Sequence, residues 1–177
     1  MGKGSLIDKN VFKRAHEIGM RELAEKSGLS DMDKSQEENY FNKVEEALKK
    51  IWPDLSVGDR VMKRRDIYFN RVLGMINEGD INQDMINKLK EMKVKYRIGL
   101  ITTVIDSLID KFLEKANLND LFDVVYASKP NEKDDKKAVF ERFIKENNKP
   151  VMHISDSKRD RVICEALGIS IKPSHKL

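Results

Sequence analysis

Four polar residues in the second half of the chain have types and spacing that could perform chemistry. Thr102, Lys129 and Asp156 each follow a different short apolar run, and Asp160 lies four residues after Asp156. Carboxylate oxygens suit a hard cation such as Mg²⁺. A lysine ammonium is a point charge for a phosphoryl group, and a threonine hydroxyl can donate to a phosphate oxygen. Together the four residues would suit a site for a phosphoryl group and a divalent cation.

Each of these residues also has an ordinary structural explanation. Thr102 could simply end a strand, and Lys129 could be a loop residue. Asp156 could cap the following helix, and Asp160 could complement the dipole of that helix from its first turn. Taken singly, the structural explanation is favoured for every residue. Their order at the ends of successive apolar runs favours a shared site.

The elements that would position these residues are strands alternating with helices. Helical apolar spacing separates four short apolar runs, which we interpret as strands: 96–101, 123–127, 151–155 and 169–171. Such alternation predicts an α/β fold with a parallel sheet. Ligands of these sheets lie at the carboxyl ends of the strands, where the four polar residues stand.

The first half of the chain is predicted to be helical. Apolar residues recur with helical spacing over 10–26 and over 40–51, before Pro53. Two further helices are expected over 59–79 and 82–92. No strand pattern interrupts this half, so we expect a helical region of its own.

Composition excludes several classes of protein. The 34 Lys and Arg residues against 30 Asp and Glu give a net charge of +4, which is small and spread out. The basic cluster 63–65 lies in a helical pattern and lacks interleaved aromatic residues, so nucleic-acid binding is not expected. One cysteine, Cys164, excludes an internal disulfide. No run of about 18 apolar residues is present, so a membrane span is not expected and the predicted location is cytoplasmic.

The order of these segments resembles the haloacid dehalogenase (HAD) superfamily. The run Ile98 to Thr102 is similar to its second motif, an apolar strand ending in Ser or Thr. Lys129-Pro130 is similar to the third motif, although Lys133, Lys136 and Lys137 lie close by and remain alternatives. The segment 153–160 is similar to the fourth motif, an apolar strand followed by two acids.

The resemblance implies a Rossmann-like parallel sheet with an inserted α-helical cap. Residues 1–9 would be the remnant of the first motif, 10–80 the cap and 81–177 the α/β core. Thr102 would hold a phosphoryl oxygen, and Lys129 would neutralise developing charge. Asp156 and Asp160 would bind Mg²⁺.

The chain departs from the family at the first motif, Asp-x-Asp-Gly-Thr/Ser-Leu. Gly4, Ser5 and Leu6 match its end, but Met1 and Lys3 stand at the two aspartate positions. Neither side chain can replace the nucleophile or the general acid. The apolar strand before the motif is also missing. In the family, that strand is central, between the strands that here end at Thr102 and Ser155.

Two explanations for this departure remain open. The sheet is rearranged, or the biological chain starts upstream. Unpaired strands would favour self-association, so a homo-oligomer is possible.

The resemblance implies a Mg²⁺-dependent phosphatase of small phosphorylated metabolites, impaired or inactive without its nucleophile. The alternative is a non-catalytic module on the same fold that binds phosphate or another protein. A complete Asp-x-Asp upstream of Gly4 would distinguish these readings.

Overall fold

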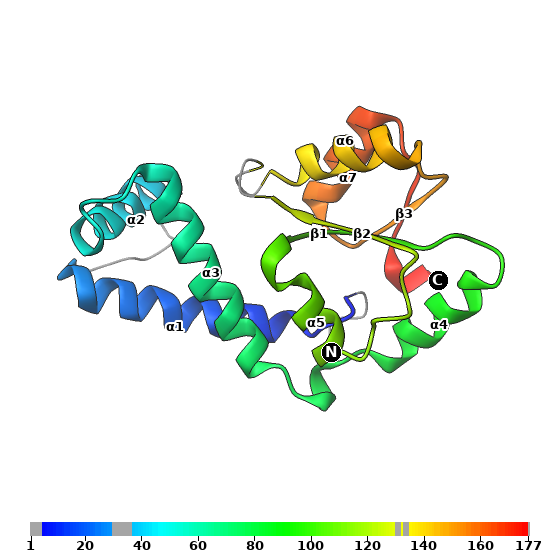
Figure 1. The fold of residues 1–177 in the computed structure, drawn as a ribbon, viewed down its shortest axis with the longest axis horizontal. Coiled ribbons are helices and arrows are strands. Elements are labelled where there is room, and N and C mark those ends of the chain that lie inside the picture. Colours follow the sequence, from blue (N-terminus) through cyan, green and yellow to red (C-terminus); the bar gives the residue numbers. More distant parts are fainter. Residues whose placement is uncertain (1–4, 30–36, 130–131, 133–134, 177) are drawn as a thin grey trace. The chain divides into compact units, whose positions relative to one another are not determined.

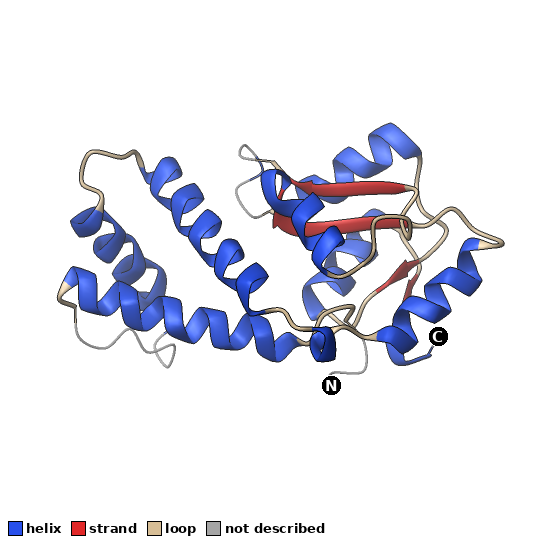
Figure 2. Cartoon of the chain, turned by 60° about the horizontal axis from the view of Figure 1, so that its bottom comes forward, coloured by secondary structure: helices blue, strands red, loops and turns tan. Residues whose placement is uncertain are grey.

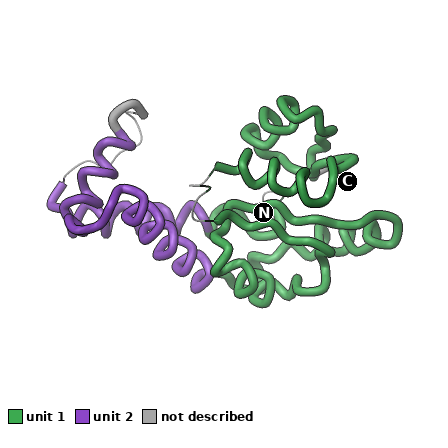
Figure 3. Tube along the Cα trace, turned by 45° about the horizontal axis from the view of Figure 1, so that its top comes forward, with its two compact units in different colours: residues 1–11, 76–177 green, residues 12–75 purple. Residues whose placement is uncertain are grey.

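The computed structural model describes residues 5–29, 37–129, 132 and 135–176. The chain divides into two compact units (Figure 3). One unit combines Met1–Val11 with Ile76–Leu177, and the other is Phe12–Met75. No helix in the described part of the chain is both long and apolar enough to cross a membrane.

The described part of the unit Phe12–Met75 consists of three helices, the first of which begins just before the unit (Figures 1 and 2). They are α1 (Lys9–Ser27), α2 (Glu37–Ile51) and α3 (Val57–Met75). Their core includes the buried residues Leu23, Val44, Ala47 and Leu48.

Sequence signals mark the ends of these helices. Gly28, with φ of +67°, follows α1 in the left-handed conformation that often ends a helix. Before α3, the Ser56 hydroxyl oxygen accepts the Asp59 N–H at 3.2 Å and so caps the helix. The spacing of the apolar residues therefore predicted these three helices correctly.

The second unit alternates strands with helices, as the sequence predicted. Its elements in chain order are η1 (Glu78–Asp80), α4 (Gln83–Lys93), β1 (Gly99–Ile105), η2 (Asp106–Leu108), α5 (Ile109–Lys115), β2 (Val124–Ser128), α6 (Lys136–Asn147), β3 (His153–Ile154), α7 (Lys158–Leu167), β4 (Ile171–Lys172) and η4 (Ser174–Lys176). The α/β class is confirmed.

The strands form two small parallel sheets. β1 pairs with β2, from Gly99 opposite Val124 onward, and β3 pairs with β4. Among the described residues, no strand joins the two sheets. This division lies between β1 and β3, where the sequence predicted that a central strand is missing.

Helix α6 covers the first sheet and carries much of the core. Phe140 and Val139 are fully buried and cluster with Ile163 and Cys164 of α7. Cys164 is therefore a packing residue, as expected. Gly99 allows a close approach here, because a Cβ at this position would lie 3.0 Å from a ring carbon of Phe143.

The strand bounds differ from the predicted ranges, most of all for β1 and β3. β1 continues past Thr102 to Ile105, and its register with β2 shifts between Ile101 and Ile105. A run of β-branched residues keeps the backbone extended beyond the predicted end. The strand predicted over 151–155 contains only His153–Ile154, since the partner β4 is equally short.

Candidate functional site

Asp160 is the centre of a buried polar cluster. Its Oδ2 atom lies 2.6 Å from Nζ of Lys136 and accepts the Ser155 hydroxyl at 2.8 Å. Nε2 of His153 lies 3.2 Å from the same oxygen. Asp160 is 2% exposed, so these donors replace the water that its charge has lost.

Three neighbouring elements place these side chains together. Lys136 is the first residue of α6, after β2, and Ser155 directly follows β3. Asp160 lies in the first turn of α7, where its N–H donates to the Ser157 hydroxyl at 3.3 Å. The cluster therefore lies where the carboxyl ends of β2 and β3 lead into helices, as expected for a ligand site of such a sheet.

The surroundings keep Asp160 ionised. Burial raises the pKa of this carboxyl, but the opposing effects are together larger. They are the hydrogen bond from His153, the charge and hydrogen bond of Lys136, and the Ser155 hydroxyl. The net pKa lies well below the ordinary value. The second oxygen, Oδ1, is buried and has no hydrogen-bond partner among the described residues.

Asp156 lies outside this cluster of contacts. It is exposed, and its Oδ1 accepts the Ser174 N–H at 3.0 Å while its Oδ2 accepts the Ser174 hydroxyl. Asp156 thus holds the C-terminal η4 segment. The helix-cap explanation for Asp156 is wrong, because Ser157 is the N-cap of α7.

The other two predicted site residues have local partners. The Thr102 hydroxyl oxygen accepts the Val104 N–H at 3.2 Å. The Lys129 side chain is exposed, and its backbone N–H donates to Oε2 of Glu132 at 2.7 Å. In the part of the chain that the structure describes, no hydrogen bond joins Thr102 or Lys129 to Asp160.

Lys136 is the lysine that the structure brings to Asp160. It was one of the open alternatives to Lys129. Of the others, Lys137 pairs with Glu141 at 3.6 Å on the helix surface. Lys133 lies outside the described residues. A sequence signal existed, because Asp135 is a suitable N-cap and places Lys136 at the start of α6, facing the strand ends.

Glu132 and Arg142 brace the segment between β2 and α6. The Glu132 carboxylate accepts Nε of Arg142 at 2.7 Å, and Arg142 also donates to the Ala127 carbonyl at 2.6 Å. Burial raises the pKa of Glu132, but Arg142 and the Lys129 N–H lower it further, so it falls below its ordinary value. Arg142 of α6 thus links that helix to Glu132 and to the end of β2 at Ala127.

Of the two predicted Mg²⁺ ligands, only Asp156 is exposed, and Ser174 donates to both of its carboxylate oxygens. Mg²⁺ often binds through one or two carboxylates, with water and phosphate oxygens completing the shell. Asp156 is accessible to solvent, whereas the Lys136 ammonium stands beside Asp160 and opposes a cation there. Among the described residues, no three acidic, His or Cys side chains gather as a metal site.

The first described residues of the chain pair with the segment that precedes α4. Ile7 forms an antiparallel bridge with Ile81, and the Asn82 N–H donates to the Leu6 carbonyl at 3.0 Å. Residues 5–8 therefore lie beside the segment before α4 and belong to neither sheet. Met1 and Lys3, which stand at the aspartate positions of the first motif, lie outside the described residues.

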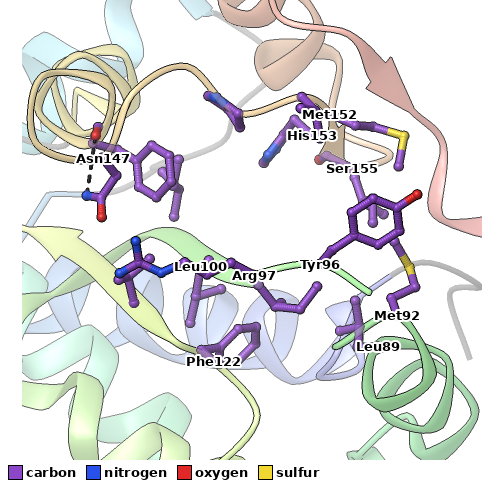
Figure 4. Close-up of a pocket in the computed structure, with 18 of the residues that line it drawn as sticks. Leu89, Met92, Tyr96, Arg97, Leu100, Phe122, Asn147, Met152, His153 and Ser155 are labelled. Carbon is purple, nitrogen blue, oxygen red and sulfur yellow. Dashed lines mark hydrogen bonds between the residues drawn. The ribbon is translucent and has the colours of Figure 1, made fainter. Parts of the chain in front are cut away.

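A pocket of about 620 Å³ separates β1 from β3 (Figure 4). Leu100 and Tyr96 line one side, and Met152, His153 and Ser155 line the other. The polar cluster borders the same pocket through Lys136, His153, Ser155 and Asp160.

Comparisons with known proteins agree with this architecture. The family model of haloacid dehalogenase-like hydrolases matches residues 6–172. A haloacid dehalogenase-like family hydrolase from Streptococcus pneumoniae has a similar structure, with a TM-score of 0.64 and 17% identity. The match covers 95% of this chain and 79% of that one, and it shows the fold. A search of curated proteins finds no match. Because the family model spans nearly the whole chain, this protein belongs to the haloacid dehalogenase-like hydrolases.

Proposed function

We propose that this chain is the scaffold of a Mg²⁺-dependent phosphatase of small phosphorylated metabolites, with little or no turnover in the form described. The observation that supports the proposal most directly is the cluster of Lys136, Ser155 and Asp160 at the strand ends of a HAD-type core. The low turnover that we propose rests on Met1 and Lys3, which stand at the positions of the two aspartates in the family motif.

Each residue of the candidate site has a proposed role. Lys136 is the third-motif lysine and presents positive charge to the phosphoryl group, in place of Lys129. Thr102 donates its hydroxyl to a phosphoryl oxygen. Asp156 holds Mg²⁺, and Asp160 orients Lys136 through their contact at 2.6 Å. When bound, Mg²⁺ would supply charge neutralisation at the phosphate oxygens.

Hydrolysis of an aryl phosphate with and without Mg²⁺ tests the proposal. We expect the chain to release phosphate no faster than Asp156→Asn. Mg²⁺-dependent turnover that disappears in Asp156→Asn would show that another carboxylate is the nucleophile, Asp8 being the first to test.

Phosphate binding distinguishes the two lysines. Inorganic phosphate is titrated in the presence of Mg²⁺ by NMR, against the chain and against Lys136→Met and Lys129→Met. We expect Lys136→Met to weaken binding several-fold and Lys129→Met to leave it nearly unchanged. If Lys129→Met weakens phosphate binding more than Lys136→Met does, Lys129 is the lysine that contacts the phosphate.

A non-catalytic binding module on the same fold is the second candidate function. The observation in its favour is the pocket between β1 and β3, whose strand edges pair with no strand in the part of the chain that the structure describes. A chain that binds phosphate or another polypeptide but never turns over substrate would support this alternative.

A further inference from the structure

Four half-buried side chains from three helices meet within the unit Phe12–Met75. His16 and Met20 lie one turn apart on α1, Tyr40 lies near the start of α2, and Arg64 belongs to α3. The Tyr40 hydroxyl lies 3.4 Å from Nε2 of His16 and donates to the Met20 sulfur at 3.3 Å. Nη2 of Arg64 donates to the same sulfur at 3.6 Å. We call these four residues the Arg64 cluster.

Arg64 is a cation whose hydrogen bond goes to a neutral sulfur. A thioether is a weak acceptor, whereas carboxylate and phosphate oxygens accept two parallel bonds from a guanidinium group. In the part of the chain that the structure describes, no carboxylate pairs with Arg64. Arg60 and Tyr68, which lie one turn away on the same helix, carry no carboxylate either. Half-burial has therefore exchanged part of the hydration of Arg64 for a poor acceptor, and an oxyanion would be a better one.

Two other arginines of α3 show the pairing that Arg64 lacks. Oε1 of Glu45 accepts Nε of Arg60 at 3.0 Å and its Nη2 at 2.5 Å. Oε2 of Glu22 accepts Nη2 of Arg71 at 2.5 Å. These two carboxylates, from α2 and α1, are thus engaged with other arginines. They leave the charge of Arg64 available to an anion from solution.

Tyr40 and His16 add polar groups beside this charge. Their contact at 3.4 Å is longer than the range of about 2.7 to 3.2 Å for ordinary hydrogen bonds, so exchanging it for a better partner costs little. The hydroxyl and the imidazole can each donate a hydrogen bond to an anion. Tyr40 also lies near the N-terminus of α2, where the helix dipole gives a positive potential. The cluster therefore combines three side-chain donors with positive potential.

We propose that Arg64, Tyr40 and His16 form a binding site for the oxyanion group of a small molecule, either a phosphate or a carboxylate. The anion replaces the Met20 sulfur as the acceptor that Arg64 and Tyr40 share. The site lies wholly within the unit Phe12–Met75, whereas Lys136 and Asp160 belong to the other unit. It therefore goes beyond the proposed phosphatase function and needs neither Mg²⁺ nor hydrolysis.

Titration of the whole chain with inorganic phosphate and with acetate tests the site. Both titrations omit Mg²⁺ and keep the ionic strength constant, and the NMR signal of the Met20 methyl group is followed. We expect a saturable shift of this signal, because Arg64 and Tyr40 leave the sulfur when the anion binds. The anion that binds more tightly identifies the ligand as a phosphate or a carboxylate. Absence of a saturable shift with both anions would overturn the proposal.

Variants of the chain locate the bound anion. Arg64→Met should weaken binding at least tenfold, because it removes the charge and the paired donors. Arg14→Met removes the same charge from an exposed position of α1 and is the matched control, which should bind normally. Tyr40→Phe removes one hydroxyl, should weaken binding several-fold, and provides the second test if Arg64→Met fails to fold. Equal affinities for Tyr40→Phe, Arg64→Met and Arg14→Met would contradict the proposal.

Melting temperatures distinguish a ligand site from a structural role for Arg64. Without an anion, Arg64→Met should melt close to the unchanged chain, whereas Arg60→Met loses the ion pair with Glu45 and should melt lower. The anion that binds should raise the melting temperature of the unchanged chain more than that of Arg64→Met. If Arg64→Met melts as low as Arg60→Met and still binds the anion normally, Arg64 is structural and the proposal is overturned. No readout depends on Mg²⁺ or on hydrolysis, so failure of the proposed phosphatase would leave this test unaffected.

Discussion

Nζ of Lys136 lies 2.6 Å from Oδ2 of Asp160, and this ion pair joins the first turn of α6 to the first turn of α7. Helix α6 packs on the sheet of β1 and β2, while Asp160 is also bonded to His153 and Ser155 at the end of β3. The pair therefore connects the two small sheets, which share no strand pairing among the described residues.

Replacing Lys136 with methionine should destabilise the protein. Asp160 would stay buried with its charge, while its two remaining donors, Ser155 and His153, would compensate only in part. Removing one partner of a buried ion pair costs about 3 kcal/mol. Urea unfolding followed by circular dichroism measures this difference in the free energy of unfolding.

A double-mutant cycle provides the control for this prediction. Asp160→Asn keeps the shape of the side chain but removes its charge. The combined Lys136→Met/Asp160→Asn variant should therefore lose less stability than the sum of the two single variants. Strict additivity would show that the 2.6 Å contact contributes no coupling energy.

Stability should fall at acid pH because of Asp160. Burial raises the pKa of Asp160, but His153, Lys136 and Ser155 lower it further, so the folded-state pKa lies below the ordinary value of 3.8. The stabilisation from this carboxylate is therefore fully present above the unfolded-state pKa. It is lost as the pH falls below about 4 toward the folded-state pKa.

The measurement is the free energy of unfolding between pH 7 and pH 3 for the chain and for Asp160→Asn. At pH 7 the free energy of unfolding of Asp160→Asn should be lower than that of the unchanged chain. Acidification should reduce it by a smaller amount. Parallel pH curves for the two proteins would mean that other carboxyl groups, such as Glu132, account for the acid sensitivity.

Gly99→Ala should destabilise the α/β unit. An added Cβ would lie 3.0 Å from a ring carbon of Phe143 and 3.2 Å from a methyl carbon of Val124. Overpacking of this kind costs about 1 to 3 kcal/mol. Gly74→Ala is the matched control, since Gly74 is exposed in α3 and a Cβ there meets no atom within 4 Å. Gly74→Ala should stabilise the protein by about 0.5 to 1 kcal/mol. Equal changes in melting temperature for Gly99→Ala and Gly74→Ala would contradict the packing argument.

The sequence predicted the elements better than it predicted the contacts between their side chains. Strand and helix identity follow from local apolar spacing and from residues such as Gly28, Ser56 and Asn82, whose effects act within one turn. The choice between Lys129 and Lys136 depends instead on the contact of Lys136 with Asp160. That contact joins side chains 24 positions apart, which no periodic pattern records.

The separation of β1 from β3 was predictable for a different reason. The resemblance places another strand between them, and no described strand lies there. The bond between Asp156 and Ser174 was not predictable, because it joins residues 18 positions apart outside any regular element pairing. It changes the expectation for metal binding, since it occupies the carboxylate that the resemblance assigns to Mg²⁺.

Ser174→Ala should therefore increase the affinity of the chain for Mg²⁺. The Ser174 hydroxyl donates to Oδ2 of Asp156, and an ion bound through that oxygen has to displace the donor. Ser174 is 1% exposed, so losing this hydrogen bond should also cost about 1 kcal/mol of stability. Mg²⁺ titrations followed by the NMR signals of residues 155–158 measure the affinity, with Asp156→Asn as the variant that should lose binding. Tighter binding in Ser174→Ala together with lower stability would show that the two partners compete for Asp156. Unchanged Mg²⁺ affinity in both variants would place any bound ion away from this carboxylate and remove Asp156 from the proposed site.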